Sequence, residues 1–244
     1  MKKSLALILS FLAPFGFLTF AEETPDPTRW TENFDSESAF DAAWGAYGWH
    51  PDGKTSSKKE DRPLWWEIKD GTLQANTSPG VHPSGITRQV AGTDVRASLR
   101  FKLPPMGLVG IGYNGPNRLL ERNFHLAGVH ITETQIRAWD EDLLHPKGSP
   151  EAKQLEAEGK WNRKFIGAAK VAGLPVAAGV WHDLVLEMRG LEIRVLLDGK
   201  EALVYTTKAG DAEKETLQLS VHSYEKQVVH GYFDNIRFEP LLRE

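Results

Sequence analysis

Hydrophobic and polar residues alternate along most of this chain, and a period of two is typical of a β-strand that buries one face. The clearest case is residues 181–205, WHDLVLEMRGLEIRVLLDGKEALVY. One alternating run begins at Leu184, stops at Arg189-Gly190 and resumes at Leu191. Two such runs around a short glycine-containing break predict a β-hairpin. Asp198-Gly199 is a second turn signal, so we expect an antiparallel meander here.

Shorter alternating runs predict further strands in both halves of the chain. They cover residues 65–68, 72–75, 95–101, 108–113, 126–131, 135–139, 217–221 and 231–238. About ten to twelve short strands separated by turns, with almost no helical period, predict an all-β fold in which two antiparallel sheets form a sandwich. The exception is a short helical insertion near residues 149–165, where Ser149 can cap a helix and Pro150 can take its first position.

The first 21 residues have a different pattern. Two lysines precede an apolar run that ends at Ala21 with small residues before it, as in a secretory signal peptide. The run is shorter than a membrane span and is interrupted by Pro14 and Gly16. We therefore expect a signal peptide over residues 1–21 and a single domain over residues 22–244. The mature product is expected to be periplasmic or extracellular, without a membrane span.

Composition narrows the chemistry. The chain has no cysteine, which excludes thiol nucleophiles and thiolate zinc sites. Its net charge is −4 and it has no basic stripe, so no nucleic-acid partner is expected. Eight tryptophans exceed what one core usually needs, and we expect some of them to be placed for stacking. An aromatic group either edges a cleft or packs over the open end of the sandwich, the latter being favoured; it comprises Trp44, Tyr47, Trp49, His50, Trp65 and Trp66.

Three features together resemble a concanavalin A-like jelly roll. They are Phe34-Asp35 near the start, the hairpin that opens with Trp181-His182 and contains the Asp198-Gly199 turn, and FDNIRF at residues 233–238. The chain resembles the exported bacterial domain described as 3-keto-disaccharide hydrolase, which is often labelled a relative of laminarinase-type glycoside hydrolases. The resemblance extends over residues 30–239 and implies a jelly-roll fold. It also implies an activity on glycosides or 3-keto-disaccharides.

The chain departs from both groups in its acidic residues. Laminarinase-type enzymes carry Glu-x-Asp-x-x-Glu or a shorter form on one strand, and no such triplet occurs here. The keto-disaccharide hydrolase domain usually has an acidic strand in mid-chain. The nearest segment here, residues 125–131 (HLAGVHI), offers His125 and His130 instead. The catalytic acids of these families therefore have no counterpart in the sequence.

The alternation also predicts a ligand-binding surface. If the apolar residues of the runs at 95–101, 126–131 and 135–139 face the core, the polar residues between them face outward. Should these strands be neighbours in one concave sheet, they form a trough that suits sugar hydroxyls, or a uronate or sulfate group. The alternative is a solvated face that carries arginines for solubility. The expected ligand-binding residues are Arg96, Arg100, His130, Gln135, Arg137 and Trp139.

The most plausible catalytic acids end the run at 135–139. A glycosidase needs two carboxyl groups on either side of the scissile bond. Asp140 and Glu141 are candidates, with His130 as a third catalytic residue and His125 and Glu121 as helpers. The alternative is an acidic turn at the end of a strand.

A metal site is a further alternative. His125 and His130 are five residues apart on a predicted strand and so point to opposite faces, which argues against a shared zinc ion. Asp234 could hold a structural calcium ion between the last strand and the backbone of residues 32–35. The alternative is a surface aspartate, and no cofactor is expected to be required.

The leading interpretation is an exported jelly-roll protein whose partner is an oligo- or polysaccharide. The first alternative is a glycoside or 3-keto-disaccharide hydrolase, and the second is a laminin G-like module that adheres to protein or to the cell envelope. The missing carboxylate triplet counts against retaining hydrolysis.

Overall fold

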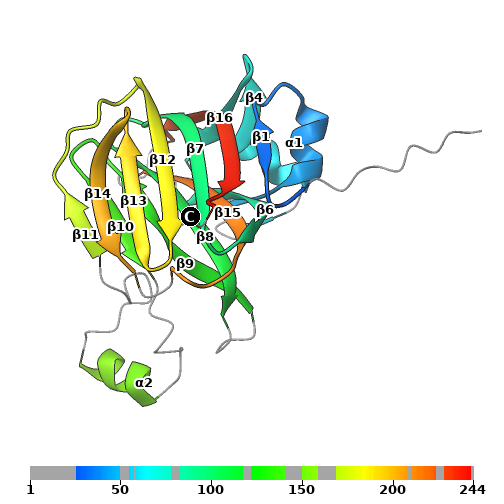
Figure 1. Cartoon of the computed structure of the whole chain (residues 1–244). Coiled ribbons are helices and arrows are strands. Elements are labelled where there is room, and N and C mark those ends of the chain that lie inside the picture. Colours follow the sequence, from blue (N-terminus) through cyan, green and yellow to red (C-terminus); the bar gives the residue numbers. More distant parts are fainter. Residues whose placement is uncertain are drawn as a thin grey trace, which may run out of the picture.

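Two antiparallel β-sheets lie face to face in this computed structural model (Figure 1). The structure describes residues 26–49, 55–57, 59–77, 83–117, 122–140, 150–158, 169–207, 210–223 and 228–242. Each sheet has eight strands within these ranges, and the strand pairs among the described residues are antiparallel. The predicted two-sheet sandwich is confirmed. The predicted signal peptide lies outside the described residues.

Sheet A contains all three strands of the predicted meander, together with the closing strand. Its order is β14 (Lys200–Thr206), β13 (Glu192–Leu197), β12 (Trp181–Arg189), β7 (Val95–Lys102), β16 (His230–Pro240), β5 (Thr72–Asn76) and β4 (Trp66–Lys69), with β1 (Trp30–Glu32) also paired to β16. Strand β1 therefore runs antiparallel beside the last strand, β16.

Sheet B is formed by the strands that come between these segments in the sequence. Its order is β11 (Ala169–Ala172), β10 (Ile136–Asp140), β9 (Arg122–Ile131), β8 (Gly107–Asn117), β15 (Lys214–Ser223), β6 (Ser84–Gly92), β2 (Trp44–Trp49) and β3 (Thr55–Ser56). Strands β7 and β9 thus belong to different sheets, which decides the position of the predicted trough.

The predicted hairpins follow from their turn residues. Leu184 is opposite Leu197 in the β12–β13 pair. Asp198 and Gly199 both have positive φ, 50° and 74°, which a two-residue type I′ turn requires and which glycine adopts without strain. The Asp198 carboxylate also accepts from the backbone N–H of Asp183 at 2.9 Å. This turn therefore sets the register of three consecutive strands.

Alternation places the core between the sheets. Along β7, Val95, Ala97, Leu99 and Phe101 are buried, whereas the residues between them are partly exposed. In β8, Val109, Ile111 and Tyr113 are buried in the same way from the other sheet. Burying a side chain of this size contributes about 1.5 to 3 kcal/mol. The residues between them face away from the core.

The described ranges also contain two α-helices and a 3-10 helix. Helix α1 (Glu37–Ala43) begins at the N-cap Ser36, whose hydroxyl accepts from the Ala39 N–H, and it buries Phe40. The 3-10 helix η1 spans Lys59–Leu64. Helix α2 (Pro150–Ala157) lies apart from the sheets in Figure 1 and confirms the first part of the predicted insertion. None of the helices in the described ranges is long and apolar enough to cross a membrane.

A buried ion pair closes the end of the sandwich near α1. Arg88, 9% exposed, donates from Nη1 to Glu32 Oε2 at 2.9 Å. Its guanidinium lies over the Trp30 ring, 3.9 Å from the centroid. The Trp44 indole N–H also donates to Glu32, at 3.3 Å. Trp44, Trp65 and Trp66 are buried here, as the packing alternative predicted, while the Trp49 side chain and His50 lie outside the described residues.

Candidate functional site

The outer face of sheet B is the surface of that sheet that points away from the core, and it carries two rows of residues paired across the strands. The first, which we call the His130 row, runs from β10 to β6 through Arg137, His130, Gly110, Ser220 and Gly85. The second, the Trp139 row, runs through Trp139, Gly128, Gly112, Gln218 and Thr87. Three of the predicted ligand-binding residues, His130, Arg137 and Trp139, thus lie together.

Glycines form the surface beneath the Trp139 ring. A Cβ atom on Gly128 would lie 3.1 Å from Trp139 Cζ2, and one on Gly112 would lie 3.5 Å from the same atom. On Gly128 it would also lie 2.7 Å from the Cα of Gly112 on the next strand. The indole therefore rests against bare backbone, and a larger residue at Gly128 would displace both the ring and the strand.

His130 lies between Arg137 and the Trp139 ring. Its ring centroid is 5.4 Å from that of Trp139. Burial, together with the nearby charges of Arg137, His125 and His222, lowers the pKa of His130 from 6.5 to about 4. The imidazole is therefore neutral at pH 7 and can accept a proton.

Polar side chains continue this face on both sides. His125 Nδ1 lies 2.7 Å from Asn114 Oδ1, and Asn114 Nδ2 donates to Thr216 Oγ1 at 2.9 Å. An amide oxygen only accepts, so Nδ1 of His125 carries the proton. Further along, Gln218 Nε2 donates to Tyr47 Oη at 2.7 Å, and burial raises the pKa of Tyr47 to about 12. The face is thus lined by fixed donors and acceptors.

The prediction that Arg96 and Arg100 share this trough is wrong. Both arginines are on β7 and face outward from sheet A, the opposite side of the sandwich. Alternation along a strand decides only inside or outside, not which of two sheets the strand joins. The guanidinium carbon of Arg100 lies 4.9 Å from the Trp181 ring centroid. Its Nε lies 3.6 Å from Oδ1 of Asp183.

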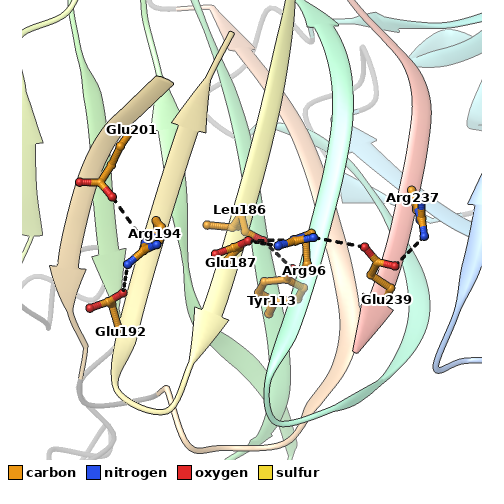
Figure 2. Close-up of polar contacts among 9 residues, drawn as sticks. All are labelled: Arg96, Tyr113, Leu186, Glu187, Glu192, Arg194, Glu201, Arg237 and Glu239. Atoms are coloured by element: carbon orange, nitrogen blue, oxygen red, sulfur yellow. Dashed lines mark hydrogen bonds and ion pairs between the residues drawn. The ribbon is translucent and has the colours of Figure 1, made fainter. Parts of the chain in front are cut away.

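Arg96 belongs to a ladder of alternating charges, which Figure 2 shows across the outer face of sheet A. Its guanidinium donates from Nε to Glu187 at 2.8 Å and lies 3.6 Å from Glu239. Arg237 donates to Glu239 at 2.7 Å, and Arg194 lies between Glu192 and Glu201. Each charged side chain of this ladder is therefore paired with a neighbouring opposite charge on the sheet.

Asp140 is placed by the structure inside the sandwich, not in a trough. Strand β10 extends to Asp140, so the period of two that turns Trp139 outward turns Asp140 inward. The carboxylate is 2% exposed and accepts from Thr207 Oγ1 at 2.8 Å and from the Tyr205 hydroxyl. This buried contact joins β10 to β14 and does not support a catalytic role. Glu141 and Glu121 lie outside the described residues.

The remaining predictions concern Gln135 and Asp234. Gln135 directly precedes β10 and is half-buried, and its carbonyl accepts from the Thr132 N–H at 2.9 Å. Asp234 lies opposite Arg100 beside a bulge in β16 and accepts from the Asn235 N–H at 2.7 Å. The described residues contain no group of three His, Asp or Glu side chains that could hold a metal ion. Calcium binding by Asp234 stays a prediction.

Gln218, Ser220 and the glycines of the two rows were not among the residues predicted from the sequence. A signal for the first two was present, since Leu217, Leu219 and Val221 were predicted to face the core and the residues between them must face outward. The glycines gave no such signal, because a glycine fits either face. Tyr47 had been grouped with the packed aromatics, yet its hydroxyl reaches Gln218 on this surface.

Acid should destabilise the protein through His130. Its pKa in the folded state, about 4, is lower than the value of 6.5 for an unperturbed histidine, so between these values the unfolded chain binds more protons. Stability is therefore lost as the pH falls from 6.5 to 4, by about 2 to 3 kcal/mol. Urea unfolding at pH 7 and 4.5 measures this loss, and His130→Gln should show a smaller loss than the wild type. Equal losses in both proteins would contradict the assignment.

Comparison with known proteins supports the fold and names the family. No curated protein matches the chain. Among solved structures, a Bacillus licheniformis β-glucanase has a TM-score of 0.61 at 10% identity, covering 88% of this chain and 99% of its own. The alginate lyase AlyC3 has a TM-score of 0.62 at 10% identity, covering 86% and 96%. A sialidase has a TM-score of 0.58 at 13% identity over 88% of this chain, which spans 19% of that protein.

These likenesses establish the jelly-roll architecture, since identities this low show the fold alone. The family follows from a different match. The model of the 3-keto-alpha-glucoside-1,2-lyase-like domain matches residues 29–239, which is nearly all of the described structure. The predicted resemblance to keto-disaccharide hydrolase domains is confirmed, and the chain belongs to the family of 3-keto-alpha-glucoside-1,2-lyase-like domains.

Proposed function

We propose that this protein binds a 3-keto-α-glucoside on the outer face of sheet B and cleaves it by 1,2-elimination, with His130 as the proton acceptor. The family description supports the substrate class. The observation that carries the proposal is a neutral imidazole on a glycine-lined surface, between the charge of Arg137 and the ring of Trp139.

This elimination requires a base that removes a proton from the substrate. It does not require two carboxylic acids. A ketone at C3 acidifies the hydrogen on C2, which His130 removes to leave an enolate. The electron pair then forms the C1–C2 double bond while the bond from C1 to the aglycone oxygen breaks, and the departing oxygen takes a proton from water. The hydroxide that remains takes the proton from His130, which returns the imidazole to its neutral form. Hydrolysis by two carboxylates is not involved, which accounts for the missing Glu-x-Asp-x-x-Glu triplet and for two rows without a carboxylate.

The neighbours of His130 have complementary roles. Arg137 is its cross-strand partner and brings positive charge to the place where the enolate forms. The half-buried Trp139 ring offers an apolar surface for the C–H groups of a sugar. Export to the periplasm or the medium, where glycosides are met, remains part of the proposal.

The test compares a ketone with the matching alcohol. Wild-type protein is incubated with p-nitrophenyl 3-keto-α-glucoside and with p-nitrophenyl α-glucoside, and release of p-nitrophenolate is followed by absorbance against a control without protein. We expect release from the keto substrate only. Release from both at similar rates would indicate an ordinary glycosidase, and release from neither would refute the lyase activity. Calorimetric titration with the same compounds then shows whether the protein only binds sugars, the leading interpretation from the sequence.

A further inference from the structure

An aromatic ring, that of Tyr47, lies on the outer face of sheet B at the β6 end of the His130 row. Tyr47 is opposite Gly85 in the β2–β6 pair, and a Cβ atom on Gly85 would overlap the Tyr47 ring. The ring therefore lies over the backbone of the last residue of the row. Trp139 lies over Gly128 in a similar way on the β10 side, where a Cβ would be 3.1 Å from the indole. Each end of this face thus carries an aromatic ring over a glycine.

A hydrogen bond fixes the position of the Tyr47 ring. Gln218 on β15 donates from Nε2 to Tyr47 Oη at 2.7 Å. Burial raises the pKa of Tyr47 to about 12, so the phenol stays neutral at physiological pH. Tyr47 and Gln218 are only half-buried, and Gly45, two residues before Tyr47 on β2, is exposed. Part of the ring is therefore open to a ligand, in a position that is set before the ligand binds.

The residues of the row between His130 and Tyr47 are small. They are Gly110 on β8 and Ser220 on β15, and Ser220 is 7% exposed. From β9 to β6 the row crosses three strand spacings, about 14 Å. Neither residue has a large side chain that would separate the imidazole from the Tyr47 ring. A ligand that contacts both must extend along the row.

The proposed reaction sets the direction of the substrate along this row. In a 3-keto-glucoside, C2 is bonded to C3 on one side and to C1 on the other. The C2 hydrogen lies at His130 in the proposed reaction, and the C3 oxygen lies toward Arg137 on β10, whose charge stabilises the enolate. C1 then points away from β10, toward β8, β15 and β6. The aglycone that leaves from C1 is therefore directed toward Tyr47.

We propose that Tyr47 forms the aglycone site, where its ring packs against a cyclic leaving group while Gln218 holds the ring in place. This inference rests on the proposed function. Contact between the Tyr47 ring and a ring-shaped aglycone removes apolar surface from water. A methyl group on the C1 oxygen is too short to make this contact. Tyr47 is thus a specificity-determining residue that favours glycosides with a cyclic aglycone.

Binding is measured apart from turnover in the His130→Asn protein, which lacks the proposed base. The ligands are p-nitrophenyl and methyl 3-keto-α-glucoside, which differ only in the aglycone, and calorimetry gives their Kd values. We expect the added change Tyr47→Ala to weaken binding of the p-nitrophenyl compound about tenfold and of the methyl compound less than about twofold. A tyrosine that only supports the fold would weaken both equally, and that result would overturn the proposal.

Two further variants identify the contact. Tyr47→Phe keeps the ring and should bind the p-nitrophenyl compound within about threefold of the protein with Tyr47. A loss as large as that of Tyr47→Ala would assign the contact to the hydroxyl and contradict packing on the ring. Tyr232→Ala removes a half-buried ring from the outer face of sheet A and should leave binding of both compounds unchanged.

Failure of this inference is distinct from failure of the proposed function. With His130 in place, Tyr47→Ala should lower kcat/KM for the p-nitrophenyl keto substrate about tenfold. If the wild type releases p-nitrophenol but Tyr47→Ala lowers kcat/KM less than about twofold, the aglycone site is refuted and the lyase activity stands. If the wild type itself releases none, the proposed function fails.

Discussion

Asparagine in place of His130 should lower kcat/KM for a 3-keto-α-glucoside by about 10² to 10⁴-fold, the contribution of a general base to a proton transfer. Asparagine keeps a polar side chain of similar reach but cannot accept a proton at neutral pH. The measurement is initial-rate kinetics with the p-nitrophenyl keto substrate. Because burial lowers the pKa of His130 to about 4, the wild-type rate should rise with pH around that value and be level near pH 6.5.

The matched control is His230→Asn. His230 is exposed on β16 of sheet A, with its Nδ1 2.7 Å from Asn76 Oδ1, and it lies outside both rows. Its replacement should leave kcat/KM unchanged. An active His130→Asn protein, or a rate that rises with pH near 6.5 instead of 4, would assign the proton transfer to another group.

Removal of the Glu32 side chain should cost about 3 to 5 kcal/mol of unfolding free energy, because Glu32→Ala leaves the buried Arg88 without its counter-charge. The carboxylate also accepts from the Phe34 N–H at 3.0 Å and from the Trp44 indole at 3.3 Å. One change thus leaves three donors at the end of the sandwich unsatisfied. Urea unfolding followed by tryptophan fluorescence gives the value.

A double variant separates the charge from the packing. Glu32→Ala with Arg88→Met removes both charges and should recover much of the lost stability, since an apolar side chain can fill the site without a counter-ion. Arg194→Ala, which breaks two ion pairs of an arginine with a 45% exposed side chain, should cost less than about 1 kcal/mol. A Glu32→Ala cost as small as this would mean that water already solvates Arg88.

The alternation in the sequence predicted which side of a sheet each residue faces more reliably than it predicted which residues lie beside it. Arg96, Arg100, His130 and Arg137 all face away from the core, as expected. Yet β7 pairs with β12 and β16, which are far from it in sequence, so the two arginines are on the other sheet. No local pattern contains that information, because the pairing of distant strands depends on how the whole chain fits together.

The positions of Asp140 and Trp181 have local causes. Asp140 was predicted to be a catalytic acid or part of an acidic turn, but the strand continues through it and turns its side chain into the sandwich. Trp181, which opens the predicted hairpin, faces outward, whereas the inward position belongs to His182, whose Nδ1 lies 2.9 Å from Asp198 Oδ2. Lys102 lies with its Nζ 4.7 Å from the Trp181 ring centroid. A large aromatic ring can lie outside the core when cationic side chains pack against its faces.

The charge ladder of sheet A has a practical consequence for handling the protein. Its three arginines are each paired with glutamates within the sheet (Figure 2), so these side chains attract a charged glycan only weakly. A surface linker or fluorescent dye attached at Arg237, which is exposed there, would leave the opposite side of the sandwich open to solution. Immobilised in this orientation, every molecule would turn the proposed sugar-binding face of sheet B toward an added ligand.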